Sequence, residues 1–473
     1  MRLPQHYSQY RDSALTKALL PTEVRCLTAL TFEANKQTQQ PRAKQTGDRD
    51  KFRTMLPSEP STVTGIATNI DRRKLILGGG MTALGLSLSG CGRAPATRYN
   101  DADIALLAKQ RKIEKDNSGQ GPYGPQIYPG YRGLAKLPWF ELDKAGNLQC
   151  TDEDVPYAID VHCHLGMSVL FRPKLDLLAE TSRVNHLLDC DATNPGCPLD
   201  LDIYINGNFS DQALDDLTMS TIAQGVWGSQ FAKTQTIPNL LREMDSMRVQ
   251  HSMLLPIKLG LPFGDQLEQD WFTAVHAGAA KQRLHVGLSV YPGDPNAVYE
   301  MRQAAARGGR IIKLHPTVQR FYPDEPALME LYAEAQALGL VVFFHGGRAG
   351  IEPTSSHQFA MPRHYEAALA EYPNLQFILG HAGARDSEAM IALAKKYDNA
   401  WLGIHGQSVT MLETMIRSTD NDRLLFGTDW PFYHLGASLA KVLITTETSS
   451  RKPLRQKILR DNARGLFPGL WQV

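Results

Sequence analysis

The sequence predicts an α/β fold, a (β/α)8 TIM barrel with a long insertion after its first strand. From about residue 155 onward, eight short apolar runs recur, and most are separated by segments of helical spacing. Polar residues gather where these runs end. Strands that alternate with helices favour a parallel sheet, and a closed barrel brings the strand ends together. A doubly wound open sheet is the alternative, but it does not explain polar residues at so many strand ends.

Each expected strand is a short run rich in apolar residues. The eight runs are Tyr157–Val161, His251–Ile257, Leu284–Val290, Arg310–Leu314, Leu340–Phe344, Leu375–Gly380, Ala400–Ile404 and Arg423–Gly427. Helical spacing is clearest in segments 325–339 and 387–398, and Gly339 is typical of a residue that ends a helix. We therefore expect the barrel domain to span residues 153–473.

The gap after the first strand is abnormally long. Residues 165–236 separate that strand from the next convincing helix, at 237–248. Loops of this length are usually functional, and this one would lie at the C-terminal face of a barrel, where active sites form. We expect a lid or a loop that shapes the substrate site. Within it, Cys190 and Cys197 either pair in an oxidising compartment or remain free thiols.

Composition excludes several classes of protein. The 473 residues carry 50 basic and 49 acidic side chains, which gives no argument for nucleic acid or for an anionic membrane surface as a partner. A hydrophobic content of 42% is ordinary for a globular protein. Six cysteines in a chain of this length do not form a disulfide scaffold.

The N-terminal region differs from the rest of the chain. Residues 1–70 are polar without apolar periodicity, so we expect them to be disordered or absent from the mature protein. A start at Met55 would leave a signal of normal proportions for the segment that follows. Residues 92–152 are rich in Pro, Gly and Tyr, with one short helical pattern near 103–115, and suit a tether.

Residues 71–91 have the layout of an export signal. Arg72 and Arg73 precede an uncharged stretch that ends at Cys91 and is shorter than the roughly 20 residues of a membrane span. The three glycines at 78–80 disfavour a buried helix. The segment resembles a twin-arginine signal with a lipoprotein box, in which Cys91 is acylated. It predicts an exported, periplasmic protein that is anchored to the membrane through a lipid at Cys91.

Asp160, His162 and His164 close the first expected strand. Because side chains alternate along a strand, these three share one face, while Val161 and Cys163 point toward the surrounding helices. Two histidines at this spacing can hold one metal ion. On their own they are more typical of an ordinary strand with polar ends than of a metal site.

The other strand ends strengthen the case for a metal. They carry Lys313 and His315, His345, His381, His405 and Asp429. Six of the 14 histidines thus lie where apolar runs end, and burying so many imidazoles without partners would be costly. Three imidazoles and one carboxylate at the mouth of a barrel suit Zn²⁺ or a similar divalent ion.

Several motifs in order carry a family resemblance. They are Asp-x-His-x-His, KLHP, FFHGG, ILGHAG, FGTDWP and ILRDNARGLF. Residues 155–470 resemble the amidohydrolase superfamily, and specifically the amidohydrolase-2-like branch of metal-dependent hydrolases and decarboxylases. The resemblance implies four metal ligands, namely His162, His164, His345 and Asp429. It also implies that Asp429 acts as the general base, that His381 polarises the reacting group, and that Asp160 lies at or close to the metal.

The resemblance also bears on the metal and the substrate. In binuclear relatives a carboxylated lysine from the fourth strand bridges two ions, but KLHP is common in the single-metal branch. It therefore implies one divalent ion, Zn²⁺ first and Mn²⁺ as the alternative, with Lys313 and His315 holding substrate. Arg348 either pairs with a substrate carboxylate or is a solvated loop residue. His405 and Trp430 either line the mouth or pack there.

Three functions remain open at the level of sequence. The first is metal-dependent hydrolysis of a small lactone, ester or amide by an activated water. The second is non-oxidative decarboxylation of an aromatic or unsaturated carboxylic acid with the same ligands. The third is a non-catalytic lipoprotein that binds a solute, against which the full set of ligands and base argues. Export favours hydrolysis, because a periplasmic enzyme is well placed to cut scavenged compounds.

Overall fold

A computed structural model describes residues 99–169, 175–186, 198–227 and 231–471. The expected extension (1–70), the expected signal (71–91) with Cys91, and both Cys190 and Cys197 lie outside the described residues. No helix in the described ranges is both long and apolar enough to cross a membrane.

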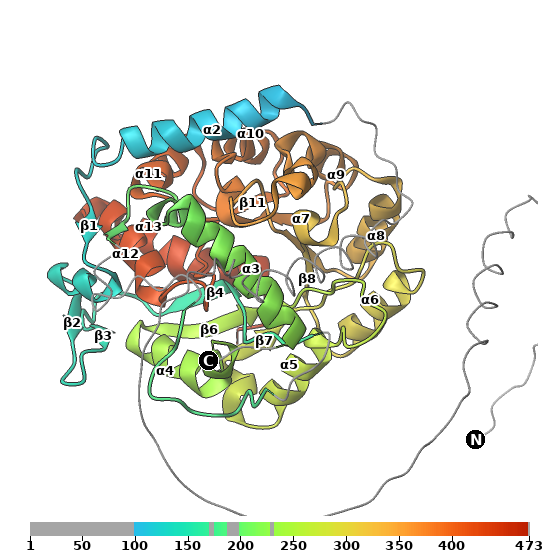
Figure 1. Cartoon of the computed structure of the whole chain (residues 1–473), viewed down its shortest axis with the longest axis horizontal. Coiled ribbons are helices and arrows are strands. Elements are labelled where there is room, and N and C mark those ends of the chain that lie inside the picture. Colours follow the sequence, from blue (N-terminus) through green and yellow to red (C-terminus); the bar gives the residue numbers. More distant parts are fainter. Residues whose placement is uncertain (1–98, 170–174, 187–197, 228–230, 472–473) are drawn as a thin grey trace, which may run out of the picture. The chain divides into compact units, whose positions relative to one another are not determined.

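The described region is an α/β protein, with helices on the outside of the strands (Figure 1). Its parallel strands are β4 (Ala158–Cys163), β6 (Val249–Leu254), β7 (Leu284–Val286), β8 (Ile311–Leu314), β9 (Val341–Phe344), β10 (Gln376–Leu379), β11 (Ala400–Gly403) and β12 (Leu424–Leu425). Each of the eight predicted runs contains or overlaps one of these strands. The α/β prediction is therefore confirmed.

Helices follow most of these strands, as the helical spacing predicts. They are α4 (Ile237–Ser246), α5 (Leu267–His276), α6 (Ala297–Ala306), α7 (Pro316–Gln319), α8 (Pro326–Ala337), α9 (Glu366–Glu371), α10 (Ser387–Lys396), α11 (Val409–Ser418), α12 (Leu435–Thr445), α13 (Lys452–Gln456) and α14 (Asn462–Leu466). Helix α8 ends just before Gly339, whose positive φ of 64° explains why glycine is suited to that position.

The strands form two parallel sheets, ordered β12-β11-β10-β9-β8 and β4-β6-β7. In the larger sheet, Ile378 of β10 lies beside Phe343 of β9 and Trp401 of β11. Isolated bridges connect Leu288 with Ile312 and Cys163 with Trp430. The two sheets are thus joined by single bridges and not by continuous ladders, so the closed eight-stranded barrel stays a prediction.

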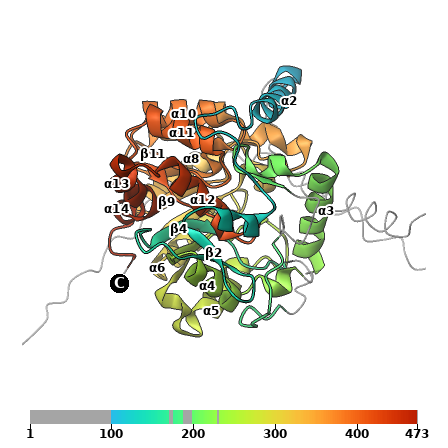
Figure 2. The same ribbon diagram turned by 90° about the vertical axis from the view of Figure 1, so that its left-hand side faces the viewer.

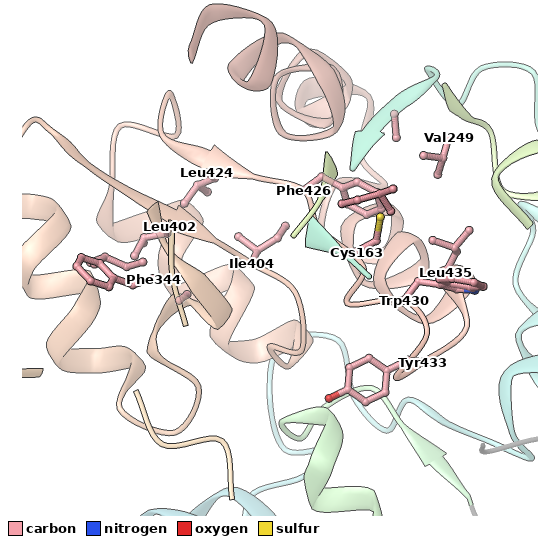
Figure 3. Close-up of a cluster of buried hydrophobic side chains, with 14 of the residues drawn as sticks. Cys163, Val249, Phe344, Leu402, Ile404, Leu424, Phe426, Trp430, Tyr433 and Leu435 are labelled. Carbon is pink, nitrogen blue, oxygen red and sulfur yellow. The ribbon is translucent and has the colours of Figure 1, made fainter. Parts of the chain in front are cut away.

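The strands are buried on both faces, as expected when helices cover a parallel sheet. One apolar cluster joins the strands to the helices and includes Cys163, Phe344, Phe426 and Trp430 (Figure 3). Val161 instead packs in a second cluster, with side chains from several strands. The register of β4 on β6 shifts between Asp160 and Cys163, and this irregularity breaks the simple alternation predicted for Val161.

The described part of the predicted tether, residues 99–152, is folded. It contains α2 (Asp101–Asp116), β1 (Ile127–Tyr128) and the antiparallel pair β2 (Phe140–Leu142) and β3 (Leu148–Cys150). Leu134, Trp139 and Phe140 are buried in the cluster shared by strands and helices. A free linker would leave such side chains in water, so this segment differs from the tether that its composition predicts.

Helix α2 is held to the strand-and-helix region by charged side chains. It begins after Asn100, whose side chain accepts hydrogen bonds from two backbone amides of the first turn. Arg363 donates to both oxygens of Asp103, and Arg385 donates to Glu114. Figures 1 and 2 both show α2 at the same edge of the molecule as α10.

The segment predicted as an insertion, 165–236, contains β5 (Leu199–Asp200) and α3 (Asp211–Trp227) in its described part. Strand β5 pairs antiparallel with β1 of the N-terminal segment. Figure 2 shows α3 outside the strands. The lid role of this segment is a prediction that the structure does not test.

Candidate metal centre

Three predicted ligands come together where β4 and β12 end. The Nε2 atoms of His162 and His164 lie 3.0 Å apart. The Oδ1 atom of Asp429 lies 3.5 Å from the first and 3.4 Å from the second. Zn–N bonds of about 2.0–2.1 Å place neighbouring ligand atoms of a tetrahedral ion about 3.3 Å apart. The three buried side chains therefore have the spacing that one divalent ion requires.

Hydrogen bonds at the far nitrogens indicate which tautomers are present. The backbone amide of His381 donates to His405 Nε2 at 3.0 Å, so this nitrogen carries no proton. His162 Nδ1 lies 2.5 Å from the same unprotonated atom, and this contact places the proton of the His162 ring on Nδ1. His164 Nδ1 donates to the carbonyl of Leu255 at 2.8 Å. Both Nε2 atoms are therefore left with lone pairs that face one another, and a cation between them satisfies both.

His405 is the partner that sequence reasoning left undecided between lining the mouth and packing. It is buried, and its ring centroid lies 4.0 Å from that of His162. Burial and the neighbouring Lys313 lower its pKa well below the ordinary histidine value, so it stays neutral and can accept from His162. Its position after β11 was the only signal in the sequence.

Asp160 ties the two ligand-bearing segments together. Its carboxylate accepts hydrogen bonds from the backbone amides of His162 and Thr428, at 2.9 and 3.0 Å, and from the Thr428 hydroxyl at 2.6 Å. Burial raises the pKa of Asp160 to about 7, although these hydrogen bonds oppose the rise. Both oxygens of Asp160 thus accept hydrogen bonds from the two ligand-bearing segments. Asp160 belongs to neither of the two sets of side chains whose donor atoms lie close enough to share an ion.

Asp429 is held in a backbone conformation that few residues adopt. Its φ is +61°, and its amide donates to the carbonyl of His162 at 2.8 Å. Aspartate tolerates the left-handed region better than most residues, and such strain is common at functional sites. Burial raises the pKa of Asp429 above the ordinary carboxyl value, although the hydrogen bond with His164 opposes the rise.

His381 faces the same carboxylate from β10. Its Nε2 lies 3.9 Å from Asp429 Oδ2, and its Nδ1 lies 3.0 Å from the hydroxyl of Tyr204. Burial and the adjacent His405 lower its pKa well below the ordinary value. Tyr204 comes from the 165–236 segment, and nothing in the sequence singles it out.

His345, the predicted third ligand, lies beside the centre but outside the two sets of close ligand atoms. Its ring stacks on that of His315, with centroids 4.0 Å apart and planes 9° apart. Among the described residues, two sets have donor atoms within 4.8 Å of one another, namely His162–His164–Asp429 and His162–His381–His405. His345 belongs to neither set, although its ring centroid is 4.4 Å from that of His381.

Lys313, predicted to hold substrate, lies inside the centre. Its Nζ is 3.4 Å from His162 Nε2 and 4.5 Å from the centroid of the Phe343 ring. Burial lowers the pKa of Lys313 to about 7, while Asp429 opposes this shift. A lysine so placed faces the ligand atoms themselves.

The prediction that Arg348 binds a substrate carboxylate, or is solvated, is wrong. Its side chain is fully buried, and its Nε and Nη2 donate to the two oxygens of Asp386 at 2.9 and 2.5 Å. Its Nη1 donates to the carbonyl of Asp103 in α2 at 2.6 Å. Every nitrogen of this guanidinium is occupied, so Arg348 is part of the structure's internal support.

Trp430 packs and does not line the mouth. Its side chain is fully buried, and its indole N–H donates to Glu243 at 3.2 Å. Glu243 also lies 3.0 Å from His186 Nε2. Burial raises the pKa of Glu243, but His186 and His434 outweigh it, and the pKa is lowered. Glu243 thus holds the residue next to Asp429, a role the sequence did not reveal.

Comparison with solved structures gives low similarity. An uncharacterised TIM-barrel protein from Bordetella bronchiseptica is 18% identical, with a TM-score of 0.47, over 67% of this chain and 99% of that chain. A probable 2-pyrone-4,6-dicarboxylic acid hydrolase from Acinetobacter baumannii is 12% identical, with a TM-score of 0.40, over 66% and 99%. Similarity at this level does not by itself establish a shared fold.

A third structure is 5-carboxyvanillate decarboxylase from Novosphingobium aromaticivorans, in complex with manganese and a nitrobenzoic acid. It is 15% identical, with a TM-score of 0.41, over 51% of this chain and 83% of that chain. No curated protein sequence matches the chain. Residues 243–469, which include His345, His381 and Asp429 and make up slightly less than half of the chain, match the amidohydrolase family, and this match supports the amidohydrolase superfamily.

Proposed function

We propose that this protein is a metal-dependent hydrolase of the amidohydrolase superfamily that cuts a small lactone, ester or amide. One observation carries the proposal. The Nε2 atoms of two buried imidazoles lie 3.0 Å apart, with a carboxylate oxygen within 3.5 Å of both. The family match over residues 243–469 supports an enzyme of the amidohydrolase superfamily. We also propose that the two parallel sheets form the (β/α)8 barrel of that family.

A divalent ion held by His162, His164 and Asp429 would lower the pKa of a water and polarise a carbonyl. Asp429 lies beside both imidazoles, so its carboxylate can accept a proton from the attacking water and pass it to the leaving group. The Tyr204 hydroxyl can donate to His381 Nδ1, which leaves a proton on Nε2. That N–H can then stabilise the oxyanion that develops on the substrate.

Metal content tests the centre directly. We expect about one divalent ion per chain in the purified protein. His164→Gln should lower the affinity for the ion at least roughly tenfold, because only two of the three ligands remain. His276→Gln is the matched control, since His276 is an exposed histidine on α5. A protein without bound ion, and without gain of activity when Zn²⁺ or Mn²⁺ is added, contradicts the proposal.

The type of reaction needs a second assay. A panel of lactones, esters, amides and aromatic acids, followed by acid release and by CO₂ release, separates hydrolysis from decarboxylation. Hydrolysis of a panel member that depends on Asp429 supports the proposal. Release of CO₂ without hydrolysis would assign the decarboxylase alternative, and tight binding without turnover would assign the solute-binding alternative.

We further propose that the protein is exported and anchored to the membrane through Cys91. The support comes from the sequence alone, from Arg72, Arg73 and the small residues before Cys91. These residues lie outside the described part of the chain. The partner of the catalytic region would then be a small molecule met outside the cytoplasm.

A further inference from the structure

Arg385 is a buried arginine on the loop that carries His381, four residues further along the chain. Its exposed fraction is 7%. Nη1 donates to Oε2 of Glu114 at 3.0 Å. Nε and Nη2 have no hydrogen-bond partner among the described residues. Buried donors on a charged group are costly to leave unpaired, so a ligand that accepts from both nitrogens would be bound favourably.

The two free nitrogens lie on one edge of the planar guanidinium. This edge forms a fork that matches the two oxygens of a carboxylate. Arg348 shows the same fork filled, since its Nε and Nη2 bind the two oxygens of Asp386. Arg385, 37 positions after Arg348, carries the same fork with no partner among the described residues.

A glycine and two carboxylates lie around the free fork. A side-chain carbon on Gly350 would lie 3.6 Å from Nε and 3.9 Å from Nη2, so the glycine leaves that position clear. The nearby carboxylate of Glu352 accepts hydrogen bonds from the amides of Ala349, Gly350 and Ile351. Glu114 binds Nη1 and a backbone amide. Neither carboxylate fills the fork.

Tyr204 links the fork to the reacting centre. The guanidinium carbon of Arg385 lies 5.5 Å from the centroid of the Tyr204 ring, and the hydroxyl of that ring lies 3.0 Å from His381 Nδ1. Tyr204 thus contacts both His381 of the metal centre and the guanidinium that carries the free fork. Since the fork is enclosed, its attraction for an anion is screened less than at the surface.

We propose that the Nε–Nη2 edge of Arg385 binds a carboxylate of the substrate, and that the substrate is therefore a lactone, ester or amide that also carries a carboxylate. The assignment to substrate rests on the proposed function. The role that the sequence suggested for Arg348 thus falls to Arg385. Because the fork is buried, its surroundings must open for the ligand to enter.

Binding of benzoate, with benzamide as its neutral isostere, tests the fork without turnover. Calorimetry on the metal-loaded protein should show that benzoate binds at least tenfold more tightly than benzamide. Arg385→Gln should abolish this preference, and Arg363→Gln should keep it, because Arg363 carries the same charge nearby but pairs with Asp103. Equal benzoate affinity in the wild type and Arg385→Gln overturns the proposal.

Arg385→Lys provides a second test in case Arg385→Gln does not fold. It keeps a cation for Glu114 but has no fork, so it should fold and still lose most of the preference for benzoate. A lysine variant that folds and retains the full preference would show that charge alone suffices, against a forked site.

A kinetic arm separates this inference from the proposed function. For an ester that is hydrolysed, Arg385→Gln should raise KM for the carboxylated form at least tenfold and leave its carboxamide analogue unchanged. If both forms are hydrolysed and Arg385→Gln changes neither KM, the carboxylate site at Arg385 is contradicted while the hydrolase proposal stands. If benzoate binding depends on Arg385 but no ester, lactone or amide is hydrolysed, the hydrolase proposal is contradicted while the carboxylate site at Arg385 stands.

Discussion

At the scale of single residues, the far nitrogens of His162 and His164 determine what their near nitrogens can do. The Nδ1 atom of His164 donates to the carbonyl of Leu255, and that of His162 lies against His405, so both Nε2 lone pairs point at the same place. The same logic applies to Arg385, where one occupied nitrogen leaves a defined edge free. The hydrogen-bond partners of some nitrogens in a side chain thus determine whether its other nitrogens can bind a metal or an anion.

Lys441 gives a pH prediction at this scale. It is a buried lysine on α12 whose Nζ lies 3.4 Å from the carbonyl of Gly406. Burial lowers its pKa from 10.5 to about 8, although Glu114, Asp200 and Asp202 oppose this. Between these pH values the unfolded chain binds more protons at this residue than the folded chain. The free energy of unfolding should therefore rise with pH across this window, by up to about 3 kcal/mol.

Lys441→Met should remove that rise. Urea unfolding of both proteins at pH 7.5 and pH 10 measures it, and the difference between the two proteins cancels other groups that titrate. Lys452→Met is the control, since its side chain is half exposed and pairs with Asp154 at the surface. The same pH slope in the wild type and Lys441→Met would contradict the assigned cause.

At the scale of elements, the Arg348–Asp386 pair joins the loop after β9 to the start of α10, and Arg348 also reaches α2. The pair is fully buried. Removing one partner leaves an uncompensated charge, so Arg348→Met should lower the free energy of unfolding by about 3–5 kcal/mol. Chemical denaturation measures the loss.

The double variant Arg348→Met with Asp386→Leu should recover most of that loss, since apolar replacements remove both buried charges. Arg363→Met is the matched control, because its pair with Asp103 is partly exposed and should contribute less than about 1 kcal/mol. A double variant as unstable as the single one would show that Arg348 supports the fold through packing.

At the scale of the whole molecule, the export proposal has its own test. Arg72→Lys with Arg73→Lys should leave the enzyme in the cytoplasm, because twin-arginine export depends on both arginines. Cys91→Ser should allow export but release the protein from the membrane fraction. Cell fractionation and immunoblotting measure both, with Cys150→Ser, a buried cysteine of β3, as the control. Unchanged distribution of both variants defeats the proposal.

The strands could be predicted because parallel strands covered on both faces appear as continuous apolar runs. The convergence of His162, His164 and Asp429 followed from their places at strand ends. Tyr204 and Glu243 could not be predicted, since their contacts depend on where the 165–236 segment and α4 pack. Arg348 was misassigned because proximity to His345 in sequence does not reveal that Asp386 reaches it first.

The folded N-terminal segment has a consequence for where an anchored enzyme would work. The described residues begin at Tyr99 and α2 at Asp101, so only eight residues lie between Cys91 and Asn100. At most about 3.6 Å per residue, the distance from Cys91 to Asn100 is no more than roughly 32 Å, against roughly 200 Å for a free tether over 92–152. A lipid at Cys91 would then confine the active site to a thin layer beside the bilayer, and only molecules that visit this layer would be turned over.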